Sequence, residues 1–138
     1  MIVVDASVAA KWLFLEPGSQ VARAVAAGPE KLFAPDLLRI EVAAAITRRA
    51  RVGGITAAEA EVTARAWLRM VAGGGIVLSP DETDLPEAVR LALGIAHPLQ
   101  DCLYLALAIR LGADLITADP TFIRRAAPLY PQVRSLLP

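Results

Sequence analysis

The chain has 138 residues, the length of one ordinary domain, and 56% of them are hydrophobic, which is enough for a packed core. Fourteen basic and fourteen acidic side chains leave no net charge, which excludes a chain that coats nucleic acid through overall positive charge. The single cysteine, Cys102, excludes a disulfide framework and a thiolate zinc cluster.

The N-terminal stretch MIVVDAS carries no basic region, and the longest uncharged run, residues 70–80, is too short to span a bilayer. Neither repeats nor a low-complexity linker divide the sequence. We therefore expect one domain over residues 1–138, located in the cytoplasm and not associated with a membrane.

Short apolar runs bounded by Gly, Pro or Asp alternate with longer segments of helical periodicity, which is typical of an α/β fold. The short runs predict buried parallel strands at residues 2–4, 31–34, 75–78, 115–117 and 133–136. The longer segments predict helices at residues 7–16, 19–27, 36–52, 56–71, 84–96 and 99–111. Right-handed helical crossovers then give one central parallel sheet of about five strands with helices on both faces.

Two aspartates follow predicted strands. Asp5 comes directly after the first strand, and Asp119 follows the strand at 115–117 after one alanine. Ligand sites in such sheets form at the carboxyl ends of the strands, so we expect both acids in one crevice if these strands are neighbours.

Two further acids interrupt helical segments that are otherwise apolar. Glu41 lies on the helical row of Leu37 and Ala45, and Asp101 opens a helix whose positions 102–109 carry no charge. Like charges about 4 Å apart repel by roughly 4 kcal/mol at an effective dielectric near 20, so four clustered carboxylates favour a bound divalent cation. Oxygen ligands without His or Cys partners indicate Mg²⁺ or Mn²⁺.

Each acid also has a purely structural interpretation. Asp119 before Pro120 is a good helix N-cap, and Asp5 and Asp101 are placed to complement helix dipoles. Glu41, in mid-helix, has no such role, unless the helical face is assigned wrongly by one position.

Other chemically interesting residues are expected outside the site. We interpret Asp36 as a helix cap, Asp114 as a loop residue and His97 as a turn residue before Pro98, because no second histidine has metal-ligand spacing. Asp84 and Glu87 have the spacing of a capping box. The arginines at 48, 49 and 51 fit a solvated helix end better than a phosphate-binding patch.

The four acids and their surroundings resemble the motifs of PIN-domain ribonucleases, most closely the VapC toxins of type II toxin-antitoxin pairs. VVDASVAAKWL resembles the opening strand, with Asp5 and Ser7, and APDLLRIEVAAAI resembles the helix with the motif glutamate, Glu41. HPLQDCLYLALAIRLGADLITADPTF resembles the remaining motifs, with Asp101, Thr117 and Asp119. Gln100 departs from the aromatic residue that many relatives carry before the third acid.

The resemblance implies a PIN-like fold, commonly a homodimer, and hydrolysis of RNA phosphodiester bonds with Mg²⁺ or Mn²⁺, leaving 5′-phosphate and 3′-hydroxyl ends. It assigns Asp5 and Asp101 as the most direct metal ligands, with Glu41 and Asp119 completing the site directly or through water. Ser7 and Thr117 are expected to orient an acid or a water molecule. A small antitoxin protein is the expected partner.

Three other interpretations stay open. A PIN nuclease of RNA processing that is no toxin would carry the same acids, and a non-catalytic PIN-like interaction domain would be marked by the loss of one. A receiver-like domain also places acids at this sheet edge, but it usually needs a lysine late in the chain. No lysine follows Lys31, which counts against the receiver.

Overall fold

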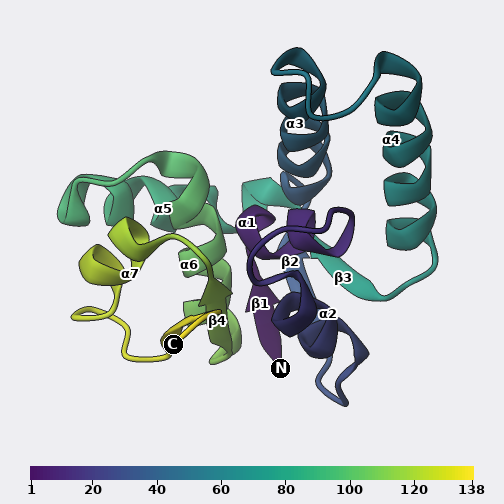
Figure 1. Ribbon diagram of the computed structural model, residues 1–138. Coiled ribbons are helices and arrows are strands. Elements are labelled where there is room, and N and C mark those ends of the chain that lie inside the picture. The colour runs from purple at the N-terminus through teal and green to yellow at the C-terminus, as the bar shows by residue number, and fades with distance from the viewer.

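The computed structural model describes all 138 residues and has a five-stranded, fully parallel sheet at its centre (Figure 1). The strand order is β3-β2-β1-β4-β5. The strands are β1 (Ile2–Val4), β2 (Leu32–Pro35), β3 (Ile76–Ser79), β4 (Asp114–Thr117) and β5 (Val133–Ser135). The predicted α/β class and the five predicted strands are confirmed, each end within one residue.

Seven α-helices and one short 3₁₀ helix connect and cover the strands. They are α1 (Ala6–Ala9), η1 (Ala10–Trp12), α2 (Ser19–Ala27), α3 (Leu38–Arg51), α4 (Ala57–Ala72), α5 (Asp81–Ile95), α6 (Leu99–Leu111) and α7 (Pro120–Ala126). The helices before β3 lie on one face of the sheet and those after β3 on the other, with α3 and α4 as an antiparallel pair (Figure 1). Right-handed crossovers require this division, because the chain reverses its direction across the sheet after β3.

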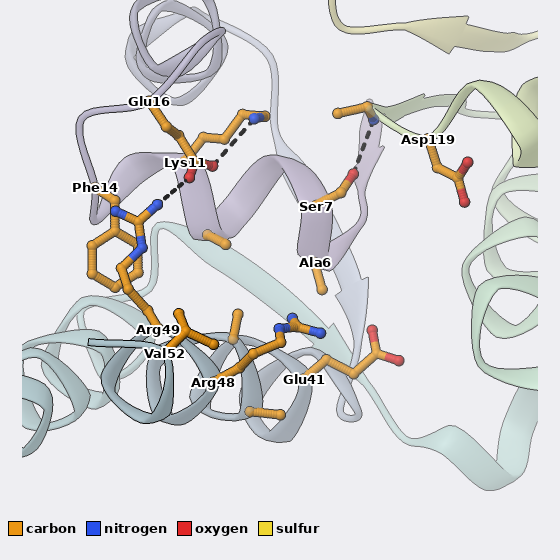
Figure 2. A pocket seen from close by; sticks show the side chains of 14 residues that line it. Ala6, Ser7, Lys11, Phe14, Glu16, Glu41, Arg48, Arg49, Val52 and Asp119 are labelled. Atoms are coloured by element: carbon orange, nitrogen blue, oxygen red, sulfur yellow. Dashed lines mark hydrogen bonds and ion pairs between the residues drawn. The ribbon is translucent and has the colours of Figure 1, made fainter. Parts of the chain in front are cut away.

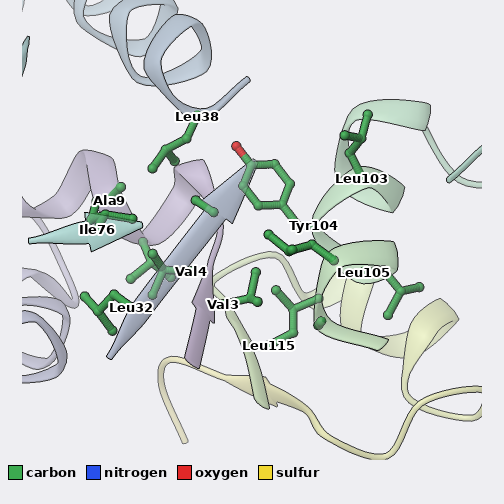
Figure 3. Packing of buried hydrophobic residues seen from close by; sticks show 14 of the residues in the cluster. Val3, Val4, Ala9, Leu32, Leu38, Ile76, Leu103, Tyr104, Leu105 and Leu115 are labelled. Carbon is green, nitrogen blue, oxygen red and sulfur yellow. The ribbon is translucent and has the colours of Figure 1, made fainter. Parts of the chain in front are cut away.

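The core is centred on α6, which packs against β1, β2 and β4. All seven residues from Cys102 to Ala108 are buried, which explains why this helix carries no charge between Asp101 and Arg110. Figure 3 shows Leu105 and Tyr104 of α6 beside Val3 and Leu115 of the sheet. The same helix therefore supplies core residues and, at its first turn, Asp101.

The predicted helix at residues 7–16 is wrong in its second half. The α-helix ends at Ala9, η1 adds one tighter turn, and no helix continues beyond Trp12. Pro17 disfavours helical backbone at Glu16, and Ser19 fixes the turn instead. Its hydroxyl donates to the Phe14 carbonyl and accepts from the Glu16 N–H.

Three acids outside the site differ from their predicted roles. Asp84 is no helix cap: α5 already begins at Asp81, and Asp84 is buried in an ion pair with Arg110 at 2.7 Å. Asp36 does not cap α3, because the Leu37 N–H that precedes the helix donates to Asp81 of α5. Asp114 is the first residue of β4 and pairs with Arg134 of β5. Asp84 and Asp114 thus pair with arginines distant in the sequence, whereas Asp36 pairs with Arg39 three residues away.

No single helix is long and apolar enough to cross a membrane. The helices α5 and α6 reach that length and hydropathy only when counted together, and they are bent by 116° relative to each other.

Candidate active site

The order of the strands places the candidate site. β1 lies between β2 and β4, and the chain turns from building one half of the sheet to building the other at the β1–β4 pair. In open parallel sheets, ligands bind beyond the carboxyl ends of the strands at this switch point. Asp5 follows β1 and Asp119 follows β4, and these two strands pair, so the condition for the two acids to share one crevice is met.

Asp5 is 4% exposed, at the N-terminus of α1. Its Oδ1 accepts a hydrogen bond from the Ser7 hydroxyl at 2.5 Å and another from the Val8 N–H at 3.1 Å. Burial raises the pKa of Asp5 to about 6, although the Ser7 and Thr117 hydroxyls and the Val8 N–H oppose the rise. A positive charge close to so buried a carboxyl would stabilise its ionised form further.

Ser7 and Thr117 connect the ends of the two central strands. The Ser7 hydroxyl accepts from the Ala118 N–H at 2.9 Å, directly before Asp119, and lies 3.5 Å from the Thr117 hydroxyl. Thr117 is fully buried and accepts from the Asp119 N–H at 3.0 Å. These two hydroxyls fix the backbone that carries Asp119 relative to Asp5.

Asp119 is the N-cap of α7, as its position before Pro120 indicates. Its Oδ1 accepts from the N–H groups of Thr121 at 2.8 Å and Phe122 at 3.3 Å. The cap role and a place in the site are compatible, because Oδ2 makes no hydrogen bond within the chain.

Asp101 lies in the first turn of α6 and is half-buried. Its Oδ2 is 2.6 Å from Nε2 of His97, the buried residue between α5 and α6. The prediction of His97 as a mere turn residue is therefore incomplete. Its ring stacks on Phe122 of α7 with 4.8 Å between the ring centroids, and His97, Asp101 and Asp119 bring ligand atoms within 4.8 Å of one another.

Glu41 lies in the first turn of α3, not in mid-helix, because α3 begins only at Leu38. Its Oε2 accepts from the Tyr104 hydroxyl of α6 at 2.9 Å. Burial raises the pKa of Glu41, and the charges of Asp101, Asp5 and Asp81 raise it further, against the Tyr104 hydrogen bond. Burial and Glu41 in turn raise the pKa of Tyr104, which keeps this hydroxyl a donor.

The four predicted acids converge on one end of the sheet. Asp101 acts electrostatically on both Asp5 and Glu41, and it shares the three-residue cluster with Asp119. No ion pair in the structure joins any of the four to a lysine or arginine. Three carboxylate oxygens, Glu41 Oε1, Asp101 Oδ1 and Asp119 Oδ2, have no hydrogen bond from the chain.

This donor set fits a hard divalent cation. The fit rests on a buried carboxyl with a raised pKa, three carboxylate oxygens that make no hydrogen bond within the chain, and the absence of a lysine or arginine partner. The nearest nitrogen, His97 Nε2, is already engaged by Asp101.

A groove of about 800 Å³ leads away from the acids between α1–η1 and α3. Figure 2 shows Glu41 and Asp119 at one end and Lys11, Glu16 and Arg49 at the other. Arg48 lines the groove between these ends, and its exposed guanidinium has no acidic partner. The three arginines at the end of α3 thus differ: Arg48 lines the groove unpaired, Arg49 is paired, and Arg51 is exposed and does not line it.

The far end of the groove is electrically compensated. Glu16 accepts from Arg49 at 2.5 Å and from Lys11 at 3.2 Å, and the Arg49 guanidinium lies 4.1 Å from the centre of the Phe14 ring (Figure 2). The turn that ends η1 early brings Glu16 to this place. Sequence reasoning missed this cluster, as it missed His97 and Tyr104, although the i,i+4 spacing of His97 and Asp101 is a signal for such a pair.

Comparison with protein-family models matches the PIN domain over residues 2–128. The chain belongs to the PIN domain family. A comparison with curated protein sequences gave no significant match.

Two solved structures show how closely this PIN domain keeps a known fold. A toxin-antitoxin complex from Klebsiella pneumoniae contains a chain with a TM-score of 0.70 and 17% identity, covering 99% of this chain and 98% of that one. Mycobacterium tuberculosis VapC20, described as a toxin that cleaves the sarcin-ricin loop, gives 0.68 and 17%, covering 97% and 99%. The predicted PIN-like fold is confirmed.

Proposed function

We propose that this PIN domain is a divalent-metal-dependent endoribonuclease and the toxin of a toxin-antitoxin pair. The observation that carries the proposal is the convergence of Asp5, Glu41, Asp101 and Asp119 at the switch point of the sheet. None of them is paired with a lysine or arginine, and Glu41 and Asp119 line a groove. The similarity to a chain of a toxin-antitoxin complex and to the toxin VapC20 supports the toxin assignment.

The residues would divide the work as follows. Asp5 and Asp101 would hold Mg²⁺ or Mn²⁺ most directly, and Glu41 and Asp119 would complete the site directly or through water. Bound there, the cation would supply positive charge that favours ionisation of a water molecule and neutralises charge on the phosphate. Ser7, Tyr104 and the α7 backbone each hold one oxygen of an acid, which would leave the other oxygen of that acid to bind the ion.

RNA would lie along the groove with its backbone against Arg48. A phosphate bound there would lie on the same side of α3 as Glu41, because residues 41, 45 and 48 of this helix line the same groove. Carboxylates alone repel RNA, so an uncompensated guanidinium next to them supplies the attraction that positions the chain of phosphates.

The test is cleavage of single-stranded RNA by the purified protein. We expect cleavage with Mg²⁺ or Mn²⁺, none in excess EDTA, and none from Asp5→Asn prepared in parallel, which excludes a contaminating ribonuclease. The chain offers no pair of histidines for metal-free acid-base catalysis, because His97 is its only histidine. Undiminished cleavage in EDTA by the protein, but not by the variant, would disprove the metal dependence.

The partners belong to the same proposal: a homodimer in the cytoplasm, inhibited by a small antitoxin protein. Light scattering at micromolar concentration should give twice the monomer mass, and expression without an antitoxin should arrest growth while Asp5→Asn does not. Normal growth combined with RNA cleavage in vitro would favour the other candidate, a PIN nuclease of RNA processing that is no toxin.

A further inference from the structure

His97 is held rigidly at the junction of three helices. Its backbone N–H donates to Ala92 of α5 at 3.1 Å, after Ala96 has taken the left-handed conformation with φ of 52°. Pro98 follows at the N-terminus of α6. The side chain is 5% exposed and stacks on Phe122 of α7 with the two rings 10° from parallel. An imidazole so confined has little freedom to turn.

The ring orientation brings one nitrogen to Asp101. Nε2 lies 2.6 Å from Asp101 Oδ2, and because an ionised carboxylate only accepts, the hydrogen of this bond belongs to Nε2. That nitrogen has then no lone pair for a metal ion. The second carboxylate oxygen, Oδ1, makes no hydrogen bond within the chain.

The same ring is linked to Asp119. Phe122, on which His97 stacks, donates its backbone N–H to Asp119 Oδ1 at 3.3 Å. The ligand atoms of His97, Asp101 and Asp119 lie within 4.8 Å of one another. His97 therefore contacts Asp101 and also packs on Phe122, whose backbone N–H holds Asp119.

We propose that His97 is a positioning residue, which aims Asp101 at the cation through its Nε2–H and is not itself a ligand. The inference rests on the proposed metal-dependent function. Groups that orient metal-binding side chains change metal affinity by about 10- to 100-fold when removed. Loss of the His97 donor would free the Asp101 carboxylate to rotate about its side-chain bonds, since no other group of the chain holds it.

Two substitutions separate the donor from the packing. His97→Phe keeps a flat ring to stack on Phe122 but has no donor, whereas His97→Gln keeps an N–H at the position of Nε2 and loses the stack. Titration calorimetry with Mn²⁺ alone should show affinity about 10- to 100-fold weaker for His97→Phe and within a few-fold of wild type for His97→Gln. Thermal melting in EDTA identifies a variant that fails to fold; His97→Leu, which likewise has no donor, then replaces His97→Phe.

Pulsed electron paramagnetic resonance of the Mn²⁺-loaded protein decides between positioning and direct binding. We expect no coupling from a directly coordinated nitrogen. Such a coupling, present in wild type and absent from His97→Phe, would overturn the proposal and make His97 a ligand. Equal Mn²⁺ affinity of wild type and His97→Phe, or no Mn²⁺ binding by the wild type, would overturn it as well.

The RNA assay distinguishes a failure of the positioning role of His97 from a failure of the proposed function. If Mn²⁺ binding depends on the His97 donor but no RNA is cleaved, the positioning role stands and the ribonuclease proposal fails. If RNA is cleaved and His97→Phe binds Mn²⁺ like wild type, the ribonuclease proposal stands and the positioning role fails.

Discussion

The two ends of the groove differ in whether their acidic side chains are paired with lysine or arginine. At the β1–β4 end, four carboxylates gather without a lysine or arginine partner, and burial raises the pKa of Asp5 and Glu41. At the α3–η1 end, Glu16 is shared between Lys11 and Arg49. The chain thus pairs an acidic side chain with basic ones at one end of this groove. The carboxylates without such partners at the other end therefore indicate a ligand that brings positive charge.

The contrast also separates Arg48 from its neighbour. Arg49 is engaged by Glu16 and Phe14, while Arg48 lines the groove and has no partner in the chain. Adjacent residues of the same type thus have different tasks: one closes the compensated end, and the other is available for a phosphate.

The largest effect is expected from Asp101→Asn, which removes one charge from the uncompensated end. RNA cleavage should fall by more than about 100-fold, since even groups that only orient metal ligands are worth 10- to 100-fold. Without metal the variant should melt at the wild-type temperature or above, because repulsion is relieved. Stabilisation by Mg²⁺, about 2.7 kcal/mol for wild type at one hundred times the dissociation constant, should shrink sharply.

Asp114→Asn is the control, since Asp114 lies at the other end of β4 and pairs with Arg134. If Asp101→Asn melts lower than wild type in EDTA and both proteins respond equally to Mg²⁺, Asp101 only complements the dipole of α6 and the four-carboxylate site is wrong.

The second effect concerns pH and the metal-free protein. Burial raises the pKa of Asp5 from 3.8 to about 6, so the folded protein keeps a proton that the unfolded chain has already released between those values. The free energy of unfolding should therefore fall as pH rises from about 4 to 6, by on the order of 3 kcal/mol from this group. Urea unfolding in EDTA should show a much shallower fall for Asp5→Asn, and equal slopes would contradict the burial argument.

A third, smaller effect distinguishes the arginines. Arg48→Ala should raise KM for single-stranded RNA about tenfold with little change in kcat, because one charge-assisted phosphate contact is lost. The slope of log affinity against log salt should decrease by about 0.7. Arg51→Ala removes an exposed arginine of the same helix that does not line the groove, and it serves as the matched control. Equal effects of both would mean that α3 contributes only general positive charge.

The smallest effect is expected at the compensated end. Glu16→Gln should free Lys11 and Arg49 for RNA and lower KM by about twofold, since partly exposed ion pairs contribute only about 0.2 to 1 kcal/mol. A higher KM would show that Glu16 positions these residues for RNA, and that the two ends of the groove are less different than their charges indicate.

The positions of the four acids could be predicted because local patterns carry them. Strand ends mark Asp5 and Asp119, and the helical segments mark Glu41 and Asp101. Their roles as ligands stay a prediction. The partners of the acids could not be predicted in the same way. From the sequence, Tyr104 is a core residue and His97 a turn residue. Their roles follow only from the contact of Tyr104 with Glu41 of α3 and that of His97 with Phe122 of α7. The predicted capping role of Asp84 was wrong for the same reason, because its partner Arg110 lies on another helix.

The spacing of the acids along the chain also determines when the site can exist during protein synthesis. Asp5 and Asp119 meet only after β4 has paired with β1, and β4 spans residues 114–117 of 138. Contacts between residues so distant in sequence form late, because the intervening chain must be present and ordered first. A growing polypeptide therefore holds at most three of the four carboxylates until Asp119 has been added, and the site is complete only once β4 has paired with β1.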